Sequence, residues 1–159
     1  MTTASEAIRG IPNACQALPN LVTGGQPGPK HLEALKAAGA AVVLDIREPD
    51  EFRGFDEAAA VRETGMEYLN IPVGHTEFSD PLMEQVLGAL RRHAGDLVLF
   101  HCASGNRCGG PLIAHLLLDH GMDEEDAIAV AFRGGLRSRA LLDWGLDYAR
   151  RHHDAGPGT

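Results

Sequence analysis

The sequence predicts an α/β fold, a three-layer sandwich in which helices cover both faces of a mainly parallel central sheet of four or five strands. Two observations support this prediction. Short apolar segments alternate with helical patterns along the 159 residues, as in parallel strands joined by crossover helices. One segment, residues 40–46, is also rich in β-branched side chains, which is typical of a buried parallel strand.

The expected strands are short, and turn signals follow them. They cover residues 20–23, 40–46, 66–71 and 96–100. The turn-rich segment 24–29 follows the first strand, and Pro72 stops the third.

Six helices are expected between and after these strands. They cover residues 30–38, 55–64, 81–93, 109–120, 124–132 and 137–151. Gly39 and Gly65 stop the first two helices. Pro81 suits the first turn of the third helix, and Asp80 is its expected cap.

Size and composition indicate one globular domain over residues 19–153. It follows a weakly patterned N-terminal segment, residues 1–18, and precedes an expected flexible tail, residues 154–159. No apolar run approaches the roughly 20 residues of a membrane span, and the N-terminus lacks the features of a secretory signal. We therefore expect a cytoplasmic protein. The formal net charge of −8 argues against nucleic-acid and anionic-membrane partners.

The most informative segment is residues 97–110. An apolar strand leads into Cys102, a short loop containing Gly105 follows, Arg107 closes the loop, and a helical pattern begins. This order places a sulfur nucleophile below a ring of backbone N–H groups at the positive end of a helix. Such a ring binds a tetrahedral oxyanion, and the helix end lowers the thiol pKa. The segment predicts a cysteine-dependent enzyme, provided that Cys102 is not shut away from solvent.

The loop residues His101-Cys102-Ala103-Ser104-Gly105-Asn106-Arg107 resemble the His-Cys-x-x-Gly…Arg phosphate loop of protein tyrosine and dual-specificity phosphatases. Residues 23–27, the strand end at 45–47 and residues 68–73 resemble the small bacterial phosphatase-like domain of the beta-lactamase-hydrolase-like family. The resemblance spans residues 21–149. It implies a cysteine phosphatase-like fold and the hydrolysis of phosphate monoesters on a protein or a small molecule, without a metal or other cofactor.

The resemblance also implies roles for the loop residues. Cys102 attacks phosphorus to form a phosphocysteine, which water then hydrolyses. Backbone N–H groups and the Arg107 fork hold the phosphoryl oxygens. The expected phosphate-binding residues are Ala103, Ser104, Gly105, Asn106, Arg107 and Cys108. His101 either supports the loop and lowers the thiol pKa, or is simply a satisfied histidine at a strand end.

A general acid is expected on the loop that follows the strand at 66–71, because the leaving group needs a proton. By its offset from Ile71, His75 lies nearest to the place of the acid in dual-specificity phosphatases. Glu77 and Asp80 are alternatives, although Asp80 has the competing role of helix cap.

Two features depart from the dual-specificity pattern. Four residues separate Cys102 from Arg107 where that family has five, and Cys108 replaces the usual serine or threonine. Four is the rhodanese spacing, and residues 44–52 resemble a rhodanese Asp-Val-Arg-Glu-Pro-x-Glu-Phe segment. A rhodanese-like sulfurtransferase with a Cys102 persulfide therefore stays an alternative, as does a non-catalytic oxyanion-binding module. Cys108 is either a small residue in the serine position or a resolving thiol for Cys102.

Overall fold

We describe residues 2–153 of the protein from a computed structural model. Its centre is a five-stranded sheet of order β1-β2-β5-β3-β4. The strands are β1 (Cys15–Leu18), β2 (Leu21–Gly24), β3 (Ala40–Asp45), β4 (Glu67–Asn70) and β5 (Leu97–His101). Strand β1 is antiparallel at one edge, and the other four are parallel. The predicted tail, residues 154–159, lies outside the described residues.

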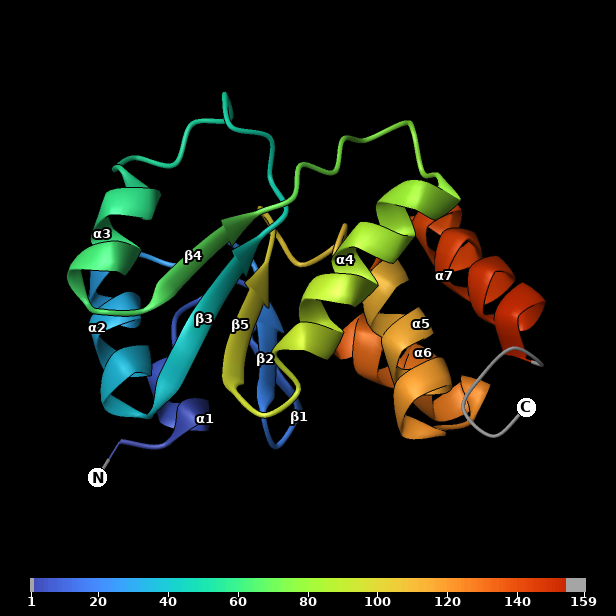
Figure 1. The fold of residues 1–159 in the computed structure, drawn as a ribbon, viewed down its shortest axis with the longest axis horizontal. Coiled ribbons are helices and arrows are strands. Elements are labelled where there is room, and N and C mark those ends of the chain that lie inside the picture. The colour runs from blue at the N-terminus through green and yellow to red at the C-terminus, as the bar shows by residue number, and fades with distance from the viewer. Residues whose placement is uncertain (1, 154–159) are drawn as a thin grey trace.

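Helices cover both faces of the sheet, so the predicted three-layer α/β sandwich is confirmed (Figure 1). One face carries α1 (Ala4–Ala7), α2 (Pro29–Ala37) and α3 (Glu57–Glu63). The other carries α4 (Asp80–Arg92), α5 (Gly109–His120), α6 (Glu124–Arg133) and α7 (Arg139–His152). Because side chains alternate along a strand, neighbouring residues of β5 pack into the hydrophobic cores on opposite faces of the sheet. Leu99 packs under α1–α3, and Phe100 under α4–α7.

Two elements in the N-terminal segment were not among those predicted. Helix α1 begins with a capping box in which Thr3 and Glu6 satisfy each other's backbone N–H groups. Strand β1 exists because it pairs with β2, with Cys15 opposite Thr23. Four-residue elements have little pattern of their own, and tertiary contacts decide whether they form.

The predicted cap of α4 is wrong by one residue. Ser79, whose backbone is extended, accepts the Leu82 N–H through its side chain. Asp80 is instead the first helical residue, and its carboxylate forms two hydrogen bonds of 2.6 and 2.8 Å with the guanidinium of Arg151.

The sheet brings three strand ends together. His101 at the end of β5 pairs with Gly24 at the end of β2 and with Asp45 at the end of β3. The loops that follow these strands therefore share one edge of the sheet, where α/β proteins place their ligand sites. None of the helices in residues 2–153 is long and apolar enough to cross a bilayer.

Candidate active site

The loop from Cys102 to Cys108 connects β5 to the N-terminus of α5 and curls around the Cys102 sulfur. Sγ accepts the backbone N–H of Gly105 at 3.1 Å. The backbone N–H groups of Ser104 and Cys108 and the Cys108 thiol also lie close enough to the sulfur to favour its charged form. Burial acts to raise the thiol pKa, but these hydrogen bonds and the charge of Arg107 outweigh it and lower the pKa of Cys102 to about 5. A thiolate is thus the expected form at neutral pH.

The prediction that Cys102 is open to solvent is wrong for this structure. The residue is only 1% exposed, because the loop amides close around the sulfur and the side chain packs into the core beneath α4–α7. An inert buried thiol would nevertheless have a raised pKa, since apolar burial disfavours the charged form. The lowered pKa of Cys102 separates it from that class.

Gly105 has a backbone conformation that the curl requires. Its φ is +90°, where L side chains are strained, and a Cβ there would collide with the carbonyl oxygen of Gly134. The next residue, Asn106, fastens the loop to the start of α7, because its Oδ1 accepts the backbone N–H groups of Arg137 at 2.8 Å and Ser138 at 3.1 Å. The loop is therefore held from outside as well as by its own hydrogen bonds.

Arg107 is held by an acidic residue that sequence analysis did not assign to the site. Its Nη1 and Nη2 donate to the two carboxylate oxygens of Glu51 at 2.7 and 2.8 Å. Nη1 also donates to the Val73 carbonyl at 2.9 Å. Among residues 2–153 these contacts use both protons of Nη1 and one of Nη2. The Nε–Nη2 edge thus keeps the two parallel donors that bind an oxyanion.

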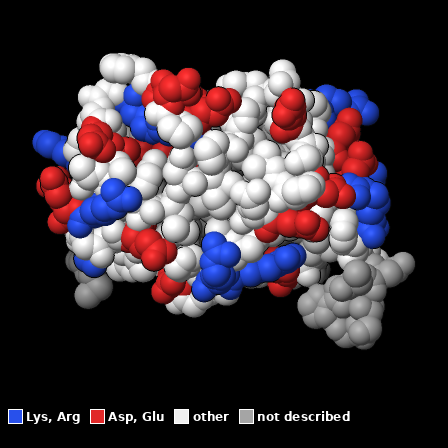
Figure 2. Space-filling model, turned by 45° about the horizontal axis from the view of Figure 1, so that its top comes forward, with Lys and Arg blue, Asp and Glu red and all other residues white. Residues whose placement is uncertain are grey.

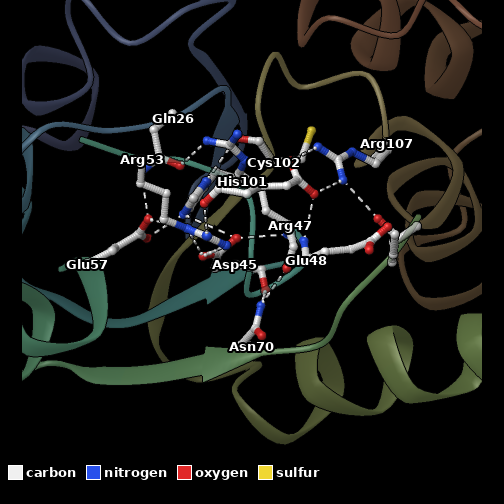
Figure 3. Close-up of polar contacts among 12 residues, drawn as sticks. Gln26, Asp45, Arg47, Glu48, Arg53, Glu57, Asn70, His101, Cys102 and Arg107 are labelled. Atoms are coloured by element: carbon white, nitrogen blue, oxygen red, sulfur yellow. Dashed lines mark hydrogen bonds and ion pairs between the residues drawn. The ribbon is translucent and has the colours of Figure 1, made fainter. Parts of the chain in front are cut away.

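A chain of hydrogen bonds joins the end of the loop to its beginning (Figure 3). From Glu51 it passes to Arg47 at 2.9 Å and on to the Gln26 amide, also at 2.9 Å. Gln26 then donates to Glu57 at 2.6 Å. His101 continues the chain, with Nε2 2.6 Å from Glu57 Oε2 and Nδ1 3.0 Å from the Cys102 carbonyl oxygen.

The inner part of this chain is a buried ion-pair network. Arg53 pairs with Asp45 at 2.9 Å and approaches Glu57 at 3.5 Å. Possible ligand atoms of Asp45, Glu57 and His101 lie within 4.8 Å of one another, a spacing that could hold a metal ion. The Arg53 guanidinium already supplies a positive charge to both carboxylates. We therefore assign the three residues to the ion-pair network.

The candidate general acids lie on the connection from β4 to α4 and at the first residue of α4. His75 and Glu77 are exposed there, two and four residues beyond Val73, whose carbonyl holds Arg107. The hydrogen bonds from Arg151 lower the pKa of Asp80, which makes Asp80 a poor proton donor at neutral pH. His75 and Glu77 thus remain the candidates.

Cys108 lies at the start of α5 with its thiol fully buried. Its side chain contacts Cys102, and both thiols are free. Burial, together with the neighbouring Cys102, raises the pKa of Cys108 well above its ordinary value. Cys108 is thus a hydrogen-bond donor to the thiolate, a role that a serine hydroxyl would also fill. Its use as a resolving thiol stays a prediction.

Sequence analysis missed Glu51, Glu57 and Gln26. Two signals pointed to Glu51. It follows Arg47 by four residues just after a strand end, and it is the second glutamate of the rhodanese-like segment at 44–52. Glu57 gave no signal beyond an acidic residue in the first turn of a helix, a common helix-stabilising position.

No protein-family model matches the chain, and no curated protein matches it by sequence. Solved structures do share the fold. A DUF442 protein from Shewanella putrefaciens CN-32, assigned as a phosphatase, is similar with a TM-score of 0.77 and 22% identity over 92% of this chain and 97% of that one. In a second crystal structure of that description the identity is 25%, with a TM-score of 0.72 over 90% and 94% of the two chains.

Two further solved structures share the fold, and one of them is named a phosphatase. TpbA from P. aeruginosa, as a Cys-to-Ser variant in complex with phosphotyrosine, has a TM-score of 0.68 and 19% identity over 87% of this chain and 83% of that one. The catalytic domain of the PP-IP phosphatase SIW14 from S. cerevisiae, in complex with citrate, has a TM-score of 0.72 and 13% identity over 91% and 93%. The chain therefore has the fold of the cysteine phosphatases.

Proposed function

We propose that the protein is a cysteine-dependent phosphatase that hydrolyses phosphate monoesters. The observation that carries this proposal is that one loop has a thiol of low pKa, Cys102, at its start and a guanidinium held in place by Glu51, that of Arg107, at its end. Cys102 accepts the backbone N–H of Gly105 at 3.1 Å and has its pKa lowered to about 5. Arg107 is fixed by Glu51 and keeps one donor edge free within the described residues.

The reaction follows from these positions. The Cys102 thiolate attacks phosphorus, the bond from phosphorus to the ester oxygen breaks, and the leaving oxygen takes a proton from His75 or Glu77. Water then attacks the phosphocysteine and restores the thiolate and inorganic phosphate. Because Cys102 is 1% exposed, the loop amides have to exchange the sulfur for phosphoryl oxygens as the substrate enters. The N-terminus of α5 stabilises the negative charge during both steps.

The surface around the site favours a substrate with one phosphoryl group. Figure 2 turns the edge of the sheet that carries the site toward the viewer and shows a wide uncharged area bordered by side chains of both signs. The three site arginines, Arg47, Arg53 and Arg107, are each paired with a carboxylate. Arg137, beside Asn106, is exposed and its guanidinium donates only to two backbone carbonyls. With most of the neighbouring arginines paired, the surface favours a monoanion or dianion over a polyanion. An aryl phosphate such as phosphotyrosine, which TpbA binds in its complex, is our first candidate.

An aryl phosphate assay tests this function. Hydrolysis by the unchanged protein and a loss of at least about 1,000-fold in Cys102→Ser support it. The variant should still bind inorganic phosphate, because its loop amides and Arg107 are intact. Turnover that survives in Cys102→Ser would refute the covalent route.

A second candidate is a sulfurtransferase, which the four-residue spacing from Cys102 to Arg107 favours. In that reaction Cys102 would carry a persulfide. A thiosulfate–cyanide assay run beside the aryl phosphate assay separates the two reactions. If neither assay detects activity and phosphate raises the melting temperature of the protein, the result would indicate a binding module without turnover.

A further inference from the structure

His101 is a buried histidine with an acceptor at each ring nitrogen. Its side chain is inaccessible to solvent. Nδ1 lies 3.0 Å from the Cys102 carbonyl oxygen, and Nε2 lies 2.6 Å from Glu57 Oε2. A carbonyl oxygen and a carboxylate oxygen both only accept hydrogen bonds, and a neutral imidazole has a single N–H. With an ionised Glu57, both contacts are satisfied together only when the ring carries two protons.

The contacts of the second Glu57 oxygen, Oε1, indicate whether Glu57 or His101 holds the proton that lies between them. Glu57 Oε1 accepts the Gln26 amide at 2.6 Å and faces the Arg53 guanidinium at 3.5 Å. Both neighbours present N–H donors to this carboxylate, so Glu57 acts as an acceptor toward them. Glu57 is therefore the acceptor in its contact with His101, and the proton belongs to the imidazole.

The charges of the buried network balance only with a charged histidine. The titratable groups that face His101 are Glu57 from α3 and Asp45 from β3, whose Oδ1 is 4.0 Å from Nε2. Arg53 pairs with both carboxylates, and the Tyr68 hydroxyl donates to Asp45 at 2.6 Å. Two carboxylates with Arg53 alone would leave a net negative charge in the interior, which is costly.

We propose that Glu57 is a positioning residue that keeps His101 as a buried imidazolium directly behind the nucleophile. The imidazolium donates to the carbonyl of Cys102 and places a positive charge next to the residue that must stay a thiolate. Burial opposes that charge, but the hydrogen bond and charge of Glu57 prevail and raise the pKa of His101 above its ordinary value. This role rests on the proposed function, in which the Cys102 thiolate is the nucleophile.

The test compares two carboxylate-to-amide changes on the same helix. Glu57→Gln removes the charge beside His101, while Glu63→Gln removes a charge at the exposed end of α3. The rate of Cys102 alkylation by iodoacetamide is followed against pH. The midpoint should lie near pH 5 in the unchanged protein and in Glu63→Gln. In Glu57→Gln it should rise by about one unit, which lowers the rate about tenfold below the midpoint. An unchanged midpoint in folded Glu57→Gln would overturn the proposal.

A second measurement needs no variant and covers the case in which Glu57→Gln fails to fold. Nitrogen-15 NMR of the unchanged protein at pH 7.5 should show both ring nitrogens of His101 protonated. A neutral tautomer at that pH would contradict the proposal. Neither readout depends on turnover. An inactive protein with a charged His101 refutes only the phosphatase function, and an active phosphatase with a neutral His101 refutes only the role of Glu57.

Discussion

Glu51 and Arg107 are 56 residues apart in the chain, yet the Arg107 guanidinium donates two hydrogen bonds, of 2.7 and 2.8 Å, to the Glu51 carboxylate. The bidentate contact fixes the plane of the guanidinium, which a single contact would not do. Glu51 comes from the segment after β3, and Arg107 closes the loop after β5. The neighbouring parallel strands β3 and β5 thus bring Arg107, the candidate anion-binding side chain, next to Glu51, which orients its guanidinium.

Removing the bidentate contact between Glu51 and Arg107 should weaken both anion binding and turnover. In Glu51→Gln the amide keeps one acceptor oxygen but loses the charge and the second acceptor, so Arg107 is held less firmly, by that oxygen and the Val73 carbonyl. We expect the value of kcat/KM for an aryl phosphate to fall about 10- to 100-fold, the cost of one or two charge-assisted hydrogen bonds. Asp50→Asn is the matched control, since Asp50 is an exposed neighbour. Equal activity of the two variants would show that the contact between Glu51 and Arg107 has no part in catalysis.

The low pKa of Cys102 predicts how the stability of the fold depends on pH. Between about pH 5 and pH 9 the native thiol is ionised while the unfolded thiol still holds its proton. The free energy of unfolding therefore rises with pH in this window, by up to about 1.4 kcal/mol per unit, and this contribution is lost as the pH falls through 5. Chemical denaturation of the unchanged protein and of Cys102→Ser measures the difference. A difference that stays constant from pH 5 to pH 9 would contradict a native thiolate.

The thiol of Cys108 should help to hold that thiolate. Cys108→Ala removes a donor to Cys102, so the midpoint of alkylation by iodoacetamide should move to higher pH. Cys108→Ser keeps a donor and should stay near the unchanged protein. If alanine and serine shift the midpoint equally, the contact between the two side chains does not set the pKa of Cys102.

His75 and Glu77 can be distinguished by the leaving group of the substrate. Loss of a general acid has little effect on an aryl phosphate whose phenoxide leaves readily, but costs about 100- to 10,000-fold on an alkyl phosphate. We expect His75→Ala to show this pattern and Glu77→Ala to lack it. The reverse result would transfer the role to Glu77, and two unaffected variants would exclude both residues.

The parts of the fold that sequence analysis predicted have strong local patterns. The strand before Cys102, the loop and helix α5 follow one another within about two dozen residues, and their apolar runs, glycine and helix signals are read without tertiary information. Strand β1 has no such pattern, because its hydrogen bonds come from β2. The burial of Cys102 was also missed, since the spacing of the loop residues says nothing about how tightly the amides close.

The site was predictable where its residues share one loop and not where they meet across the sheet. Cys102 and Arg107 belong to one short motif. Glu51 and Glu57 reach the same place from the connection after β3 and from the start of α3, and only the register of β3 against β5 brings them there. Acidic residues near strand ends are common, so the pairing of a particular carboxylate with Arg107 or His101 could not be inferred.

Detection of a phosphorylated Cys102 is the most direct test of the account. The protein is mixed with an aryl phosphate, quenched within milliseconds and analysed by mass spectrometry of its peptides. We predict that the peptide containing Cys102 gains one phosphoryl group during turnover and loses it when the substrate is exhausted. Hydrolysis with no phosphate on Cys102, or sulfur transferred from thiosulfate to Cys102 without any phosphatase activity, would contradict it.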